Sequence, residues 1–280
     1  MIAKRKSIAF AIFASLLLCS FALRSLYARK PLSPSFDAAY CWADKSLSVG
    51  QWLYEELPTG HKYYLYLPEK YRDSADDESA KLPLFVTFHG SGEKYRALKY
   101  GKIFTDSSFQ KKIAGGRGAA VLVPLSRIDY FTDAHSMSLL IQNVVLKNKC
   151  IDAQNIIGYG FSQGAAFVVE LACRNPRLFK VVVSGSGFYR ISARELLGVL
   201  GVSFYSAISE DDKGIFEQGH TTGKLLGFFC RNSRYVQYKS RRHFFLELKD
   251  ESGKFLPSEN RNETLEDWLI VSSGNENSVF

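Results

Sequence analysis

A serine between two glycines lies where a predicted strand ends and a predicted helix begins. The motif Gly-Phe-Ser-Gln-Gly occupies positions 160–164, after the apolar run 155–160 and at the start of a helical pattern that continues to 174. Glycines let the backbone turn sharply, so the turn would present the Ser162 hydroxyl beyond the strand, beside a helix N-terminus that favours negative charge. This strand–turn–helix setting predicts that Ser162 is a nucleophile. A simple glycine–serine loop is the alternative.

A second glycine-rich turn, His-Gly-Ser-Gly at positions 89–92, directly follows another buried-type strand run. Backbone N–H groups of such a loop, together with the N–H of the residue after the nucleophile, can stabilise the oxyanion of a tetrahedral intermediate. The candidate donors are Ser91, its neighbour Gly90, and Gln163. His89 is assigned a structural role in holding this loop.

An activated serine also needs a base, and the base needs an acid that orients it. His243 follows the last predicted strand and is the candidate base. Asp212 follows an earlier apolar run and is the preferred acid, with Asp211 as the alternative and Glu210 as a poorer third choice. A solvated acidic loop at the start of a helix is the alternative explanation for these carboxylates.

The elements that must position these side chains alternate along the chain. Strand patterns cover 51–55, 63–67, 82–88, 119–124, 155–160, 180–184, 202–208 and 235–239, and helical patterns cover 134–147, 164–174, 193–200, 216–230 and 264–271. Residues 95–113 have mixed helical spacing, and Asn262 is the expected N-cap of the last helix. Such alternation predicts an α/β fold with a mostly parallel central sheet and helices on both faces.

The N-terminus has the pattern of an export signal. Basic residues at 4–6 precede an apolar run over 8–23, which at about 16 residues is short for a bilayer-spanning helix. A cleaved signal peptide, an uncleaved membrane anchor and a lipoprotein attached at Cys19 are all consistent with it. Residues 24–45 are predicted as a linker and 46–275 as the folded domain. The expected location is periplasmic or extracellular, with membrane contact through a retained N-terminal segment.

Composition narrows the possible partners and cofactors. The 280 residues are 46% hydrophobic and 23% charged, which is typical of a globular protein. The net charge of +8 comes from scattered basic residues without a basic aromatic stripe, so no nucleic-acid partner is expected. No metal or organic cofactor is predicted. Four cysteines follow the N-terminal segment, an even number that permits disulfides, without the CxxC spacing of a zinc site: Cys41, Cys150, Cys173 and Cys230.

Several of these stretches together resemble a known family. Tyr-Tyr-Leu-Tyr-Leu-Pro at 63–68, Leu-Phe-Val-Thr-Phe-His-Gly-Ser-Gly at 84–92, Ile-Asp at 151–152 and the 160–164 motif resemble the esterase branch of the α/β hydrolases. That branch includes polyhydroxybutyrate-depolymerase-like and feruloyl-esterase-like exported enzymes, and carboxylesterases of the acyl-protein-thioesterase and phospholipase group. The resemblance covers about 60–245. Ala165 and Ser209 depart from it, because these families usually carry glycine there.

The resemblance implies an α/β-hydrolase fold with Ser162 as nucleophile, His243 as base and Asp212 as acid. The expected activity is hydrolysis of a carboxylic ester, in a small-molecule or acylated substrate, through an acyl-enzyme. A serine peptidase or acyltransferase could use the same triad. A non-catalytic binding protein of the same fold is a third alternative, although binding alone does not require serine, acid, histidine and the glycine loop together.

Overall fold

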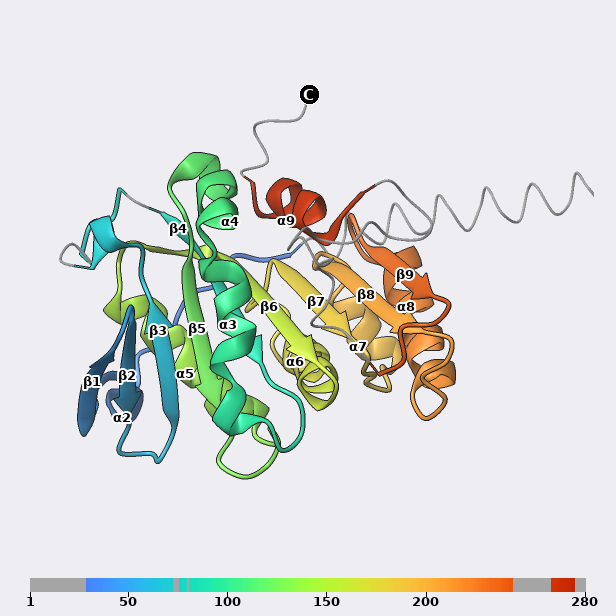
Figure 1. Cartoon of the computed structure of the whole chain (residues 1–280), viewed down its shortest axis with the longest axis horizontal. Coiled ribbons are helices and arrows are strands. Elements are labelled where there is room, and N and C mark those ends of the chain that lie inside the picture. Colours follow the sequence, from blue (N-terminus) through green and yellow to red (C-terminus); the bar gives the residue numbers. More distant parts are fainter. Residues whose placement is uncertain (1–28, 73–75, 80, 244–262, 275–280) are drawn as a thin grey trace, which may run out of the picture.

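A single sheet of nine strands forms the centre of the molecule. The computed structural model describes residues 29–72, 76–79, 81–243 and 263–274, and Figure 1 shows their arrangement. The strand order is β1-β2-β3-β5-β4-β6-β7-β8-β9. The strands are β1 (Lys45–Val49), β2 (Trp52–Glu56), β3 (Lys62–Tyr66), β4 (Leu82–Phe88), β5 (Ala120–Leu125), β6 (Ile151–Phe161), β7 (Val181–Gly185), β8 (Ser203–Ser209) and β9 (Arg234–Tyr238).

Most of this sheet is parallel, as predicted. Strands β5, β4, β6, β7, β8 and β9 run in one direction, while β1, β2 and β3 add an antiparallel edge. In a parallel sheet the carboxyl ends of neighbouring strands meet at the same edge. The residues that follow β6, β8 and β9 therefore come together in space, although they are far apart in the sequence.

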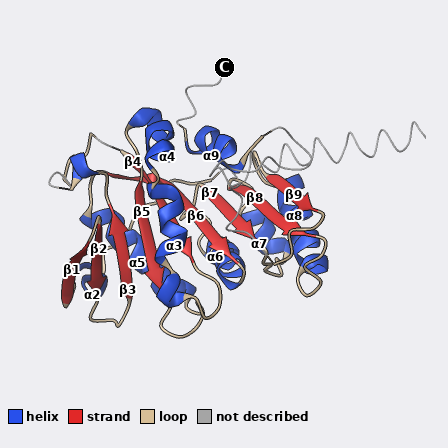
Figure 2. Cartoon of the chain, in the orientation of Figure 1, coloured by secondary structure: helices blue, strands red, loops and turns tan. Residues whose placement is uncertain are grey.

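Helices cover both faces of the sheet, which confirms the predicted layering (Figures 1 and 2). Helices α3, α4 and α9 pack on one face, and α2, α5, α6, α7 and α8 pack on the other. Their bounds are α2 (Ala38–Cys41), α3 (Leu98–Thr105), α4 (Ser107–Lys112), α5 (Ala134–Lys147), α6 (Gln163–Arg174), α7 (Ala193–Gly198), α8 (Phe216–Phe229) and α9 (Leu265–Ser273), with 3-10 turns at Glu69–Tyr71, Lys94–Arg96 and Ile113–Gly116.

The central strands hold the two cores together. Every residue of β4, β7 and β8 is buried, which explains why β4 and β7 are mostly apolar and do not alternate with exposed polar residues. Phe85 on β4 stacks on Phe104 of α3 with ring centroids 4.6 Å apart. Full burial of one such side chain is worth about 1.5–3 kcal/mol. The strands that end at the candidate site are thus fixed firmly by packing on both sides.

The segment before the sheet is packed against the domain over its described part. Leu32 lies within the core, and the backbone N–H groups of Ser35 and Asp37 donate to Gln142 and Asn143 on α5. Strand β1 was not predicted, because all five of its residues are exposed and no apolar alternation marks it. It forms by pairing with β2 at the edge of the sheet.

The predicted N-cap of the last helix is wrong. Helix α9 begins after Thr264, whose hydroxyl accepts the N–H of Asp267 while the Asp267 carboxylate accepts from Thr264. This reciprocal capping box satisfies two backbone N–H groups at once, an advantage that a single asparagine cap lacks. Asn262 lies outside the described residues.

All four cysteines in the described part of the chain are free thiols, and all are buried. Cys173 lies on α6 among apolar neighbours, as the sequence predicts. Burial raises the pKa of the Cys41, Cys150 and Cys173 thiols, which disfavours the reactive thiolate. The predicted export segment at 1–23 lies outside the described residues, and among the helices that are described none combines the length and apolarity needed to cross a membrane.

Candidate active site

Ser162 lies in a strained turn between β6 and α6. Its backbone has φ 55° and ψ −120°, a conformation that a side-chain-bearing residue adopts at a cost of about 1–3 kcal/mol. The Ser162 N–H donates to the carbonyl of Gly185 on β7 at 2.9 Å, which fixes the turn to the sheet. Strand, tight turn and helix follow one another as predicted, and the half-buried serine stands at the carboxyl edge of the sheet.

Three glycines allow the surrounding backbone to approach this turn closely. A Cβ on Gly160 would lie 2.2 Å from the carbonyl oxygen of Gly164, and a Cβ on Gly164 would lie 2.3 Å from that of Phe88. A Cβ on Gly187 would lie 2.2 Å from the carbonyl oxygen of Ser162. Each distance is far below van der Waals contact, so these positions accept glycine alone unless the turn moves. The glycines of the motif therefore serve the packing that holds Ser162 in place.

The structure brings together the three residues predicted as nucleophile, base and acid. His243 Nε2 lies 2.8 Å from Ser162 Oγ, and His243 Nδ1 lies 2.8 Å from Asp212 Oδ2. The Asp212 side chain is 8% exposed and that of His243 is 42% exposed. The ring of Phe161 packs against the imidazole with centroids 5.4 Å apart. A buried carboxylate thus orients an accessible imidazole, and the imidazole contacts the serine hydroxyl.

The two other candidate acids have different partners. The Asp211 carboxylate accepts the Ser209 hydroxyl and the Arg242 N–H, and that of Glu210 accepts the Gln237 side-chain amide. Hydrogen bonding from Ser209, followed by the Arg242 N–H, holds the pKa of Asp211 below its usual range. The alternative of Asp211 as the acid next to His243 is therefore wrong on geometric grounds.

The glycine-rich loop after β4 lies against the serine. A Cβ on Gly90 would stand 3.4 Å from Ser162 Cβ. Within the loop, the Gly92 N–H donates to the Asp129 carbonyl and the Glu93 N–H donates to the Gly90 carbonyl, so these two N–H groups are already used. As the first residue of α6, Gln163 has an N–H without an intrahelical acceptor. The predicted donors Gly90 and Gln163 thus lie beside the nucleophile, and Ser91 follows Gly90 in the same loop.

Comparison with known proteins finds solved structures with a similar fold. No family model matches the sequence, and no curated protein matches it. Among solved structures, a thermostable esterase superposes with a TM-score of 0.55 at 17% identity, covering 71% of this chain. This chain spans 55% of that esterase. A ferulic acid esterase superposes with a TM-score of 0.51 at 11% identity, covering 70% of this chain and 88% of its own.

The chain has the α/β-hydrolase fold. In this fold the nucleophile stands on a strand-to-helix turn at the top of a parallel sheet, and the acid and the histidine follow in that order along the chain. Here the turn after β6, the loop after β8 and the loop after β9 carry Ser162, Asp212 and His243. At these identities the likeness concerns architecture alone, because one fold can carry many different activities.

The sequence does not predict a clamp that fixes the Ser162 turn from its side. The Gln163 side-chain amide donates to the Phe131 carbonyl at 2.8 Å, and its oxygen accepts the Phe131 N–H at 3.1 Å. The Phe131 ring in turn stacks on Phe167 of α6. This pair joins the residue after the nucleophile to a loop 32 positions away. Gln163 therefore offers its backbone N–H to the site while its side chain holds the neighbouring loop.

A second missed cluster supports the glycine-rich loop. The Glu93 carboxylate pairs with the Lys99 ammonium at 2.5 Å and accepts the Tyr100 hydroxyl. Burial raises the pKa of Glu93, but the hydrogen bonds from Lys99 and Tyr100 outweigh it, so the net shift is downward. Tyr100 also lies against Phe161, with ring centroids 6.0 Å apart. The loop that borders Ser162 is thus anchored to α3 by a charged residue of its own.

His89 has the structural role predicted for it. The ring is fully buried, Nδ1 lies 2.7 Å from the Gly90 carbonyl, and Nε2 lies 3.3 Å from the Ser126 N–H. A neutral ring protonated at Nδ1 satisfies both contacts, whereas a second proton on Nε2 would face another N–H. Burial is the main cause that lowers the pKa of His89 below its ordinary value of 6.5.

The depressed pKa of His89 predicts a pH-dependent contribution to stability. Below about pH 6.5 the His89 ring is protonated in the unfolded chain but stays neutral in the folded chain. The free energy of unfolding therefore falls as pH decreases. His89→Asn keeps a donor for the Gly90 carbonyl but does not titrate. Its stability deficit relative to wild type is expected to shrink between about pH 7.5 and 5 in urea unfolding. A deficit that stays constant with pH would contradict this assignment.

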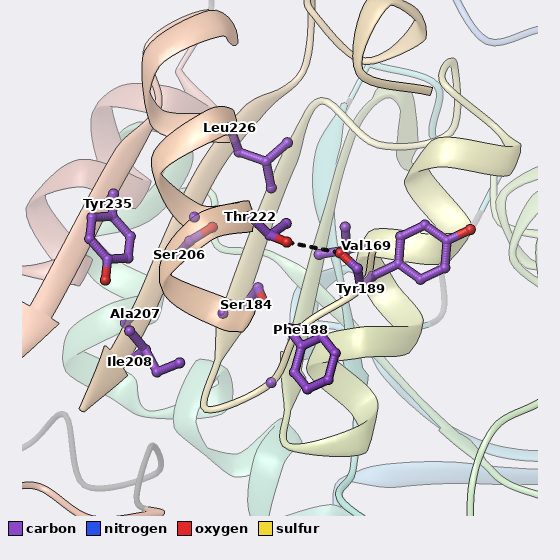
Figure 3. Close-up of a pocket in the computed structure, with 13 residues that line it drawn as sticks. Val169, Ser184, Phe188, Tyr189, Ser206, Ala207, Ile208, Thr222, Leu226 and Tyr235 are labelled. Atoms are coloured by element: carbon purple, nitrogen blue, oxygen red, sulfur yellow. Dashed lines mark hydrogen bonds between the residues drawn. The ribbon is translucent and has the colours of Figure 1, made fainter. Parts of the chain in front are cut away.

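Two cavities in the described part of the molecule are lined by residues other than Ser162, Asp212 and His243. A cavity of about 10 Å³ lies between α6, β7, β8 and α8, where Thr222 donates to the Tyr189 carbonyl (Figure 3). This volume suits one water molecule. A larger cavity of about 450 Å³, lined in part by Trp52 and Arg72, lies at the β1–β3 edge, with β5 and β4 between it and β6.

Proposed function

We propose that this protein is a serine hydrolase that cleaves carboxylic esters through an acyl-enzyme. The observation that carries the proposal is the unbroken series of contacts from Asp212 through His243 to Ser162, each 2.8 Å long. Ligand binding does not require an acid, a histidine and a serine in contact with one another. This arrangement is suited to removing the proton from a serine hydroxyl. The names of the solved structures with this architecture, a thermostable esterase and a ferulic acid esterase, support an ester as the substrate.

The first half of the reaction follows from the geometry. His243 Nε2 takes the proton of Ser162 Oγ while the oxygen attacks the ester carbonyl carbon, and Asp212 keeps the Nδ1–H tautomer and stabilises the imidazolium. The tetrahedral intermediate carries negative charge on the former carbonyl oxygen. The N–H of Gln163, with that of Ser91 or Gly90, stabilises this charge by about 3–4 kcal/mol per donor.

The remaining steps release both products. The imidazolium gives its proton to the departing alcohol oxygen, which leaves the acyl group on Ser162. Water then enters, and His243 removes its proton as the water oxygen attacks the acyl carbon. The imidazolium returns this proton to Ser162 Oγ as the acyl–serine bond breaks and the carboxylic acid leaves. No step requires a metal or an organic cofactor. Phe161 beside the imidazole gives this part of the site an apolar wall.

We also propose that the enzyme acts outside the cytoplasm, which the basic residues at 4–6 and the apolar run at 8–23 support. A retained N-terminal segment would hold it at the membrane, and cleavage would release it. The proposed location can be tested separately from the chemistry, because the triad residues all lie in the described part of the chain.

A fluorophosphonate probe tests the activity directly, because it reacts with serines that an adjacent base activates. We expect covalent labelling of the wild-type protein on the peptide that contains Ser162, and no labelling of Ser162→Ala. Ser186→Ala is the matched control, since Ser186 is buried at a neighbouring strand end with a positive φ of its own and lies outside the triad. Labelling elsewhere, or none in a folded protein, would refute the proposal. Labelling of separate cell fractions with the same probe shows where the protein is located. The mass of the labelled protein shows whether the N-terminal segment has been removed.

A further inference from the structure

The loop that carries His243 needs an anchor besides the triad itself. His243 follows the edge strand β9 and its side chain is 42% exposed, so packing alone does little to hold it. The residue before it, Arg242, has a φ of 53°, a left-handed conformation that is unfavourable for residues other than glycine. A base held in such a loop would spend part of its time away from the nucleophile unless other contacts fix the backbone.

We propose that Ser209 and Asp211 form a clasp that positions the His243 loop for catalysis, an inference that rests on the proposed function. The Ser209 hydroxyl accepts the Arg241 N–H at 2.7 Å and donates to Asp211 Oδ1 at 2.6 Å. The same Asp211 oxygen accepts the Arg242 N–H at 2.7 Å. Two consecutive backbone N–H groups just before the base are therefore bound by two side chains at the end of β8.

The clasp is built into the same strand end as the acid of the triad. Ser209 is the last residue of β8 and is 2% exposed, and Asp211 precedes Asp212. Asp212 holds the ring of His243, whereas Asp211 and Ser209 hold the backbone that leads to it. The two neighbouring carboxylates thus have different roles. That of Asp212 orients the imidazole, and that of Asp211 sets the position of the loop.

Charge makes the clasp stronger than a neutral turn contact. An ionised carboxylate forms shorter and stronger hydrogen bonds to N–H and O–H donors than a neutral acceptor does. The hydrogen bonds from Ser209 and Arg242 hold the pKa of Asp211 below its usual range, which matches an anion stabilised by its partners. The adjacent Glu210 has no such role, because its carboxylate accepts the Gln237 side chain on β9.

Paired substitutions separate positioning from general stability. Ser209→Ala and Asp211→Ala remove the clasp, while Ser209→Thr and Asp211→Asn keep an acceptor in place. We expect kcat with p-nitrophenyl butyrate to fall about 10- to 100-fold in the alanine variants, the scale of a lost hydrogen bond to a charged group, with KM changed less than about threefold. The conservative variants should recover most of this loss. Glu210→Ala is the matched control and should retain wild-type kcat.

Hydrogen exchange of the Arg241 and Arg242 backbone amides supplies a readout that is independent of activity. Asp211→Ala is expected to accelerate exchange there and Glu210→Ala is not. Unchanged exchange, or wild-type kcat in Asp211→Ala, would overturn the clasp while leaving the proposed function intact. A wild-type protein that hydrolyses no ester and binds no fluorophosphonate would refute the proposed function instead. Asp211 is only half-buried, so its substitution leaves a folded protein even where Ser209→Ala does not.

Discussion

Ser162→Ala and His243→Ala are each expected to lower kcat by about 10⁴- to 10⁶-fold, and the double variant by no more than either alone. The reason is that the 2.8 Å contact makes one functional unit of the two side chains: a base without the hydroxyl has no nucleophile to activate, and the hydroxyl without the base stays protonated. Rate losses from independent contributions would multiply, whereas losses from parts of one unit do not.

Steady-state hydrolysis of p-nitrophenyl butyrate by the two single variants and the double variant checks this prediction. Thermal unfolding of the same proteins serves as the control. The His243 side chain is 42% exposed and Ser162→Ala removes a single oxygen, so the unfolding midpoints should stay close to wild type. Fold-losses in kcat that multiply in the double variant would show that Ser162 and His243 act separately. A His243→Ala variant with wild-type kcat would require another base.

The central part of the fold was predictable because its strands carry a strong local signal. The apolar run 82–88 coincides with β4, and the helical pattern 134–147 coincides with α5. Burial on both faces leaves few polar positions in such strands, so their limits are visible in the sequence. Strand β1 has no buried residue, and its pairing with β2 is a tertiary effect that no local pattern reveals.

The candidate site was predictable in outline for a topological reason. Parallel strands bring their carboxyl ends to one edge, so residues just after β6, β8 and β9 meet whatever their separation in the sequence. The sequence does not decide which of Asp211 and Asp212 is the acid. Both lie in one short turn, and the direction of each side chain depends on the path of the loop after β9, which the sequence does not define.

Supporting contacts were the least predictable part. The clamp between Gln163 and Phe131 and the clasp of Ser209 with Asp211 join residues through side-chain to backbone hydrogen bonds across long stretches of chain. Such bonds require only polar side chains of common types, and their partners are backbone groups that nearly every residue has. Ser209 stood out as a departure from the family pattern, yet its partner at Arg241 is visible in the structure alone.

The neighbouring acids provide the sharpest test of the site. Asp212→Asn is expected to lower kcat by about 10⁴-fold, the scale seen when the orienting acid of a serine protease triad becomes an amide. In the wild-type protein the Asp212 carboxylate accepts the Nδ1–H of His243 at 2.8 Å. An amide that turns its NH₂ toward the ring would favour the tautomer with the proton on Nε2, which cannot remove the proton from Ser162.

Asp211→Asn removes the same charge one residue earlier and is the matched control. Its amide oxygen can still accept the Ser209 hydroxyl and the Arg242 N–H, so kcat should fall less than about tenfold. The two variants differ in net charge from wild type by the same amount, and long-range electrostatics therefore cannot explain a difference between them. Similar losses from both would contradict the separate roles assigned here. A large difference places the effect at the hydrogen bond between Asp212 and the imidazole.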